Sequence, residues 1–256
     1  MGEVQMAQGL LLSAAATYRR EGWDSLLAVA STKLRKCAQQ LRDVQDHLAH
    51  SFEVCSLEHA FDFDERCAIQ QSALALIQGQ VFSSEESVPR GFHFQVGEGS
   101  PLTSCFSCAV GFLVGPSGAS PTPGSPLKVA VAIQSRGPLP IPIRALEAEF
   151  SDPACDRRVE FAAGAAGGVG EGGVGGGLSL LSLGGDGSDV AQSLVLRPSE
   201  WKRCVLEICP EQLGHLQCNR VRLFVGDASQ FEFEFHSLAL PGSTVPEVTG
   251  IGIEGP

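Results

Sequence analysis

The chain has 256 residues, 43% of them hydrophobic and 18% charged, so it is long enough for one large or two ordinary domains with real cores. Its 29 Asp and Glu residues outnumber its 18 Lys and Arg residues, which gives a net charge of −11 at pH 7. This acidic balance disfavours nucleic-acid binding through phosphate neutralisation, and no run of about 18 apolar residues indicates a transmembrane segment.

The first twenty residues predict an amphipathic helix. A signal peptide is disfavoured because Glu3 stands where a basic patch is expected. Nine cysteines are scattered through the chain without a secretory signal. This distribution indicates reduced thiols in the cytosol that serve mainly as packing residues.

Apolar residues recur at helical spacing from Val4 to about Gln80. Glu21 and Gly22 interrupt the pattern, and Asp24 is predicted to cap the next helix through its carboxylate. The two resulting stripes are Leu10, Leu11, Ala14, Ala15 and Tyr18, then Leu26, Leu27, Ala30, Leu34, Cys37, Ala38, Leu41, Val44 and Leu48.

A further helix is predicted over residues 64–80, and the basic cluster in residues 33–42 is predicted to be a solvated helix face. Helices joined by tight turns are typical of antiparallel pairs in an α-solenoid. We therefore expect residues 1–85 to form a helical region that ends a longer solenoid.

Beyond residue 81 the apolar residues no longer recur at helical spacing but at every second position. Short alternating segments separated by Gly, Pro and Ser turns, with no helices between them, predict an antiparallel immunoglobulin-like β-sandwich over residues 86–256. The expected fold class is therefore α+β multidomain. The predicted strands lie in residues 104–115, 127–136, 143–150, 202–209, 220–226 and 231–238.

Residues 161–192 contain twelve glycines and three charged residues, and we predict a disordered insertion there. The GVGEGG stretch at 168–173 matches the glycine pattern of a dinucleotide site. The required strand and helix are missing around it, so no cofactor is predicted.

Cys105 and Cys108 have C-x-x-C spacing, but no second pair repeats it, and alternation would point them to opposite faces of a strand. Packing is the favoured interpretation, and a thiol- or zinc-dependent protein using these cysteines and a histidine is the alternative. His47 and His50 are three apart on the second helix without the glutamate of an H-E-x-x-H motif. No catalytic, cofactor-binding or metal-binding residues are predicted, and we do not expect an enzyme.

The segment YRREGWDSLLAVASTKLRKCAQQLRD, residues 18–43, resembles the end of the foie gras domain in the family of trafficking protein particle (TRAPP) complex subunit 11. Downstream, residues 101–112, 140–152 and 194–208 resemble in layout the gryzun-type β region that follows in that family. We expect Trp23 to be buried at a bend between two helices and Gly22 to permit a turn that a side chain would obstruct. The matching residues are Tyr18, Arg19, Glu21, Gly22, Trp23, Leu26 and Leu27.

The resemblance implies a scaffold subunit of a vesicle-tethering complex in endoplasmic reticulum to Golgi transport and autophagy. Its implied partners are the other TRAPP subunits and, indirectly, Rab-type GTPases and transport vesicles. Its implied location is cytoplasmic and peripheral at ER-Golgi and Golgi membranes. The glycine-rich stretch is foreign to the family pattern, and the chain is much shorter than the family's full length, so we expect a fragment. A coat- or adaptor-like cargo-binding module is the alternative, because helical solenoids and β-sandwiches also occur together in vesicle coats.

Overall fold

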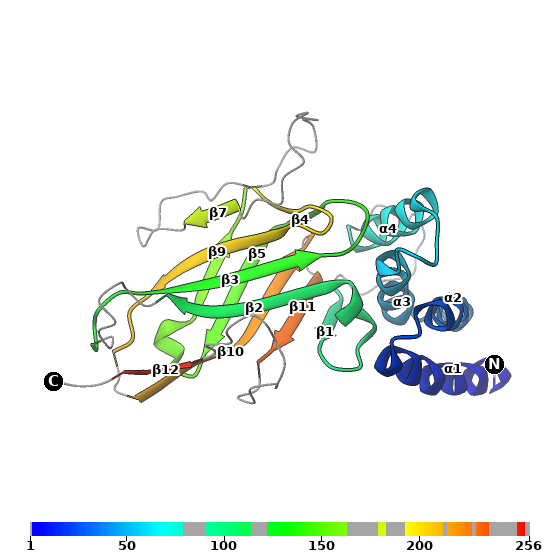
Figure 1. Cartoon of the computed structure of the whole chain (residues 1–256), viewed down its shortest axis with the longest axis horizontal. Helices are drawn as coiled ribbons and strands as arrows, with labels where there is room; N and C mark the ends of the chain where they lie inside the picture. The colour runs from blue at the N-terminus through cyan, green and yellow to red at the C-terminus, as the bar shows by residue number, and fades with distance from the viewer. Residues whose placement is uncertain are drawn as a thin grey trace.

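Four helices precede a set of β-strands in the computed structural model (Figure 1). The structure describes residues 2–78, 91–113, 122–162, 179–182, 193–211, 214–226, 229–235 and 250–253. Within these residues the α+β class is confirmed, whereas the solenoid and immunoglobulin-like assignments stay predictions. The helices are α1 (Gly2–Glu21), α2 (Asp24–Leu41), α3 (Val44–Ser56) and α4 (Phe63–Ile77).

The predicted break between the first two helices is confirmed, but two details of the helical prediction are wrong. Asp24 is the first residue of α2 and not its cap, because Trp23 holds the cap position without a side-chain hydrogen bond. The second stripe does not form one helix, because Arg42 adopts a left-handed φ of 58° and ends α2. The Asp43 carboxylate then accepts from the Asp46 N–H (3.0 Å) and starts α3.

All six predicted strands are present within about two residues of their expected starts, apart from β10, which begins earlier. The short helices η1 (Pro101–Ser104) and η2 (Pro153–Cys155) lie between strands. The strands are β1 (His93–Val96), β2 (Phe106–Leu113), β3 (Leu127–Ser135), β4 (Ile141–Ile143), β5 (Ala145–Phe150), β6 (Arg157–Glu160), β7 (Ser179–Ser182), β8 (Leu194–Leu196), β9 (Trp201–Ile208), β10 (Gly214–Val225), β11 (Ser229–Glu234) and β12 (Gly250–Ile253).

These strands form a six-stranded sheet in the order β1-β11-β10-β5-β6, with β12 also on β10, and a four-stranded sheet in the order β2-β3-β9-β7. Strands β4 and β8 pair separately. The prediction of a purely antiparallel arrangement is wrong, because β1 runs parallel to β11 and β7 runs parallel to β9. Both parallel pairs join segments far apart in the sequence, which no local turn signal specifies.

The predicted glycine-rich insertion is not uniform. Phe161 at its start is buried, and the apolar SLLS stretch within it forms β7 against β9. The GVGEGG stretch and the other residues of 163–178 and 183–192 lie outside the described residues.

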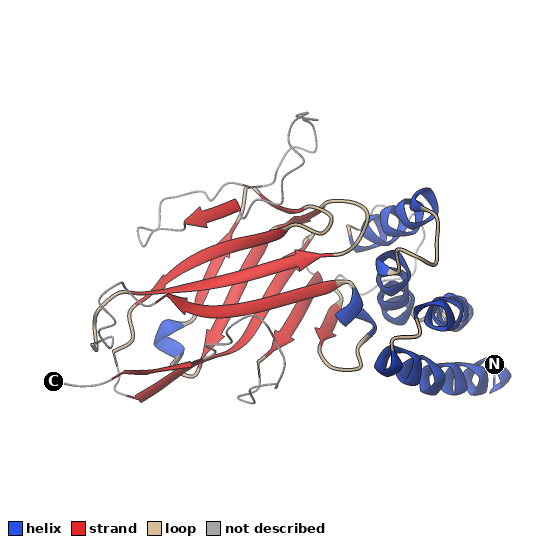
Figure 2. Cartoon of the chain, in the orientation of Figure 1, coloured by secondary structure: helices blue, strands red, loops and turns tan. Residues whose placement is uncertain are grey.

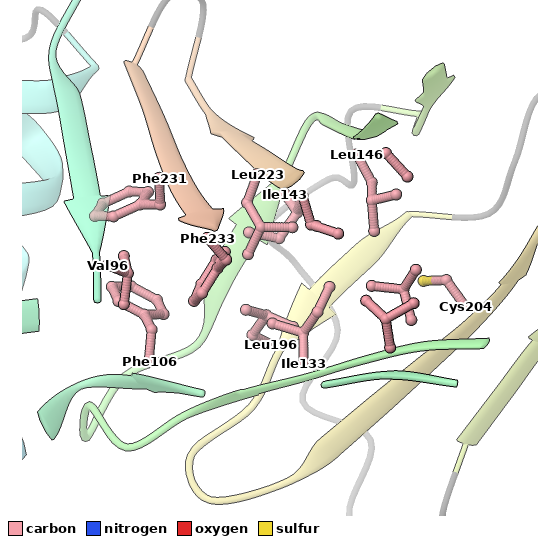
Figure 3. Close-up of a cluster of buried hydrophobic side chains, with 14 of the residues drawn as sticks. Val96, Phe106, Ile133, Ile143, Leu146, Leu196, Cys204, Leu223, Phe231 and Phe233 are labelled. Atoms are coloured by element: carbon pink, nitrogen blue, oxygen red, sulfur yellow. The ribbon is translucent and has the colours of Figure 1, made fainter. Parts of the chain in front are cut away.

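One apolar core fills the space between the two larger sheets (Figure 3). Ile133 and Cys204 point inward from the four-stranded sheet, and Leu223, Phe231 and Phe233 point toward them from the other. The alternation predicted for residues 127–136 places Leu127, Val129, Val131 and Ile133 of β3 in the core, and all four are buried.

Figure 2 shows the helices at one end of the sheets. Side chains of α3 and α4 belong to the same apolar core. Phe52 of α3 is fully buried, and its ring lies 5.6 Å from the Phe231 ring and 5.9 Å from the Phe106 ring, centroid to centroid. Edge-to-face and tilted ring pairs of this kind add to the apolar burial. Phe52 therefore joins the helices to both sheets.

Polar contacts surround this apolar joint. The side chain of Gln70 on α4 is completely buried; it donates to the Leu139 carbonyl and accepts from the Leu139 N–H, both at 2.9 Å. A Cβ at Gly137 would lie 2.7 Å from the Gln70 side-chain oxygen, so only glycine fits there without displacing this amide. Gln45 of α3 donates to the His93 carbonyl at 2.9 Å.

We expect Phe52→Ala to lower the free energy of unfolding by about 3 to 5 kcal/mol, because it leaves a cavity among aromatic rings. Denaturant unfolding followed by circular dichroism measures this loss. Phe63→Ala is the matched control, because Phe63 on α4 is 62% exposed and its truncation removes little buried area. Equal effects of the two substitutions would contradict the shared core.

Candidate functional site

The turn between α1 and α2 is held by backbone hydrogen bonds around a glycine. The Trp23 N–H donates to the Tyr18 carbonyl (2.9 Å), and the Leu27 N–H donates to the Trp23 carbonyl (2.9 Å). Gly22 has a φ of 69°, in the left-handed region that disfavours residues with a Cβ. A Cβ there would meet no atom within 4 Å, so the backbone conformation and not crowding selects glycine.

Trp23 lies at the surface of this turn and is 51% exposed, so the prediction of a buried indole is wrong. Its ring lies near the Tyr18 ring of α1, 5.9 Å away between centroids. Trp23 stands just before α2, and its side chain projects from the turn. Leu27, one turn later, points into the contact with α1 and is only 3% exposed.

Trp23, Leu26 and Val29 form an exposed apolar strip that we call the hairpin surface. Leu26 is 48% exposed and Val29 is 54% exposed. Residues three apart are neighbours on a helix, so these side chains follow one another along α2. Grouped exposed apolar side chains that include a tryptophan are typical of protein-binding surfaces.

The seven residues of the sequence motif therefore have different roles. Tyr18 and Leu27 pack within the hairpin, Arg19 forms an ion pair, and Gly22 makes the turn. Glu21 is exposed and pairs with Arg20 at 3.0 Å. Only Trp23 and Leu26 contribute to the hairpin surface.

A buried carboxylate beneath the hairpin ties three helices together. Glu53 of α3 is 0% exposed and accepts two hydrogen bonds from the Arg19 guanidinium of α1, one of them from Nη2 at 3.0 Å. Its Oε2 also accepts from the Ser31 hydroxyl of α2 (2.6 Å), and the His50 ring nitrogen lies 3.3 Å away. Arg19 donates further to the Gly99 carbonyl after β1 (3.3 Å), so the same network reaches the β region.

This network keeps Glu53 ionised. Burial on its own raises the pKa of Glu53, but hydrogen bonds from His50, Arg19 and Ser31 and the charge of Arg19 hold that pKa below its ordinary value. Breaking a buried pair by removing one partner is costly, because the other charge is left without compensation. The ionised Glu53 therefore holds together the two helices that carry the hairpin surface.

The outer face of the six-stranded sheet carries a second charged cluster, in which arginines pair with glutamates of neighbouring strands. Arg222 of β10 pairs with Glu149 of β5 and with Glu232 of β11, the latter at 2.7 Å. Arg220, two residues before it, pairs with Glu234 at 3.2 Å. Burial raises the pKa of Glu232, but Arg222, Arg220 and His93 outweigh it and keep the group ionised. We interpret this face as cross-strand stabilisation of the sheet.

A polar cavity of about 370 Å³ lies where the helices meet the β region. Across it the Ser56 hydroxyl of α3 donates to the Ser104 hydroxyl of η1 at 2.9 Å. Charges of both signs line it, so it selects neither anions nor cations strongly. Its lining residues are Asp24, Ser56, Leu57, Glu58, His59, Ser104, Gln134, Arg136 and Ser199.

Of the two cysteines of the C-x-x-C pattern, Cys105 is buried in the β core and Cys108 is partly buried against it. Cys105 ends η1 and is 0% exposed, and Cys108 lies on β2 opposite Ile133. Burial raises the pKa of both thiols well above the ordinary value, and it raises that of Cys204 to about 12. A neutral thiol is a poor nucleophile and a poor metal ligand, which favours the packing interpretation.

The histidine pair does not act as a unit. His47 and His50 lie on α3 and not on the second helix, because α2 ends at Leu41. His47 Nδ1 lies 3.2 Å from the Arg35 carbonyl, and His50 turns to Glu53. Within the described residues, no three His, Cys, Asp or Glu side chains gather as a metal-ion site.

Sequence reasoning missed Glu53, although a signal was present. The HSFEVC stretch places one carboxylate among apolar neighbours on a helix, and a charge in such a position requires a buried partner. The sequence pattern also did not indicate that the neighbouring Phe52 is buried, because the apolar stripes marked only one face of the helix.

The N-terminal helices are similar to a known family. Residues 1–57, which include all of α1, α2 and α3, match the family model described as Foie gras liver health family 1. The match supports the foie gras resemblance of the hairpin motif. No curated protein sequence matches the chain.

Solved structures similar to the chain are distant. A CARDB domain from Pyrococcus furiosus, in complex with di-metal ions, is 10% identical with a TM-score of 0.26 over 51% of this chain and 88% of that one. Red sea bream transglutaminase is 12% identical with a TM-score of 0.27 over 51% of this chain and 15% of its own. The alkylpurine DNA glycosylase AlkC of Pseudomonas fluorescens, bound to DNA with an abasic site analogue, is 12% identical with a TM-score of 0.25 over 83% and 47%. Likenesses this weak assign neither a fold nor a function.

We expect Glu53→Gln to lower the free energy of unfolding at pH 7 by about 3 kcal/mol, because Arg19 loses its buried counter-charge but stays partly exposed. The folded-state pKa of Glu53 lies below that of the unfolded chain, so the ion pair stabilises the fold at neutral pH. This contribution disappears as the pH falls below about 4. Denaturant unfolding of the wild type and of Glu53→Gln between neutral and acid pH measures the difference in their free energies of unfolding, which is expected to shrink as the pH falls.

Glu58→Gln is the control for this prediction. The Glu58 carboxylate is 54% exposed and lies 3.8 Å from Arg66, so its loss is expected to change the free energy of unfolding by less than about 1 kcal/mol. A stability gap between wild type and Glu53→Gln that stays constant down to acid pH would contradict an ionised Glu53.

Proposed function

We propose that this chain is a non-catalytic scaffold subunit of a TRAPP-type vesicle-tethering complex, acting in endoplasmic reticulum to Golgi transport and in autophagy. The observation that carries the proposal is the match of residues 1–57 to the foie gras family model, which is compatible with a trafficking role. In this proposal residues 1–85 end a foie gras-type helical region, and residues 86–256 form a gryzun-like β region.

The hairpin surface supports a role in protein binding. Trp23 and Leu26 are exposed and lie at the turn that Gly22 makes between α1 and α2. The ion pair between Arg19 and Glu53 connects α1 to α3 beneath this turn. A partner that covers such preorganised side chains gains apolar burial without ordering the backbone. We therefore assign the hairpin surface to contact with a neighbouring subunit.

A non-catalytic role is part of the proposal. The buried thiols have raised pKa values, and the buried Glu53 carboxylate lies within hydrogen-bond distance of His50 and accepts from Arg19. These groups stabilise the fold and are covered by it, which supports scaffolding over chemistry. Nucleotide exchange on a Rab-type GTPase would belong to other subunits of the assembly.

The proposed partners are the other TRAPP subunits, and the proposed location is cytoplasmic, at the surface of ER-Golgi and Golgi membranes. None of the described helices combines the length and the apolar character that crossing a membrane requires. Both the partners and the location follow from the family resemblance of residues 1–57.

Affinity purification of the tagged chain from cells, followed by mass spectrometry, tests the proposal. We expect TRAPP subunits with the wild type and with the control Phe63→Ala, whose exposed ring lies on α4 outside the hairpin surface. The double variant Trp23→Ala and Leu26→Ala is expected to lose them. Recovery of coat or adaptor proteins instead would favour the alternative function, and unchanged recovery by the double variant would contradict the hairpin surface as the contact.

We also expect Trp23→Ala to change the free energy of unfolding by no more than about 1 kcal/mol, because its indole is half exposed and packs only at the hairpin edge. Thermal unfolding of the purified protein measures this. A loss of several kcal/mol would show that the indole is a core residue and that the partner assay reports misfolding.

A further inference from the structure

The outer strands of the two larger sheets differ in how their free edges are protected. A strand edge presents unpaired N–H and C=O groups, and proteins normally guard it with charges, proline, bulges or a covering element. Strand β1 is covered by Gln45 of α3, which donates to the His93 carbonyl. Strand β6 carries three charged side chains in four residues, Arg157, Arg158 and Glu160.

Strand β2 is an edge strand with fewer of these guards. Its eight residues, FSCAVGFL, include no charge and no proline. It pairs with β3 along its whole length, and no other described strand pairs with it. The short strand β12 approaches it but pairs with β10. Figure 1 shows β2 along the lower margin of the four-stranded sheet.

The side chains of β2 fix the strand in place and leave space on its outer face. Phe106, Val110 and Phe112 point into the core and are 2%, 5% and 6% exposed, so apolar packing holds the strand beside β3. The outward positions Ala109 and Gly111 are small, and a Cβ added at Gly111 would meet nothing within 4 Å. Bulky side chains of a neighbouring strand therefore have room beside this edge.

We propose that the edge of β2, with which no described strand other than β3 pairs, binds an extended, uncharged segment of another protein, which adds to the sheet as a further strand. An extended chain is the only backbone that satisfies a row of strand N–H and C=O groups. Charge matching selects its composition, because a charged residue beside the uncharged strand would lose water without gaining a partner. Its large apolar side chains would alternate above Ala109 and Gly111. This inference goes beyond the proposed scaffold role and uses a different surface.

Selection of peptides from a random phage-displayed library on the purified full chain tests the inference. We expect peptides with an uncharged, alternating apolar stretch that protect amides 106–113 from hydrogen exchange. Gly111→Lys places a charge at the edge and should weaken the selected peptides by at least about tenfold. Ala132→Lys is the matched control, because Ala132 lies on the same face one strand further in, opposite Ala109, and should leave affinity unchanged.

Melting temperatures of both variants show whether they fold, and Ser107→Lys, at another outward position of β2, replaces Gly111→Lys if that variant unfolds. The inference would be overturned if the selected peptides bound the variant with a lysine on β2 as tightly as the wild type, or if no peptide were selected. Amides 106–113 that are already protected in the free monomer would assign the edge to a segment of this chain. Self-association that the edge lysine abolishes, seen by light scattering, would assign it to a second copy and equally overturn the proposal.

Discussion

Phe52 and Glu53 stand at successive positions of α3, and the rest of the molecule depends on the two directions in which they point. Adjacent residues on a helix project about 100° apart, so one side chain enters the β core while the next faces α1 and α2. Phe52 fills the space between the Phe106 and Phe231 rings, and Glu53 holds Arg19 and Ser31. The two contacts differ in kind. Apolar packing tolerates small shifts, whereas the buried ion pair fixes distance and orientation, because a displaced charge loses its compensation.

This arrangement explains how a small helical layer presents an exposed aromatic residue without unfolding around it. The exposed side chains of the strip, Trp23, Leu26 and Val29, are not the buried ones that pack α2 against its neighbours. Partner binding at that strip and stability of the fold therefore rest on different side chains. The polar cavity between helices and sheets lacks this character, since its charges offset one another.

Periodicity in the sequence predicted three helical segments, the second of which the structure divides into α2 and α3, and the six main strands, because period 3.6 and period 2 are local properties. Periodicity failed where the structure depends on residues of other segments that pack against the one in question. The stripe from Leu26 to Leu48 marks an amphipathic surface but cannot show that Arg42 turns left-handed and divides it. Trp23 was expected inside because of its size, yet position in the turn decided its exposure. The parallel pairing of β1 with β11 and the partners of Glu53 join distant segments, for which one sequence holds no pairing signal.

The joint at Phe52 also has a consequence for how the chain is made. The ribosome releases α3 and α4 long before it synthesises β11, so Leu48, Phe52, Ala73 and Ile77 leave the exit tunnel without the rings that later cover them. Contacts between residues so distant in sequence form late, because a long intervening loop must first be closed. During translation the helices therefore expose an apolar surface of the kind that chaperones bind. The nascent chain completes its core only after its last long strands have been synthesised.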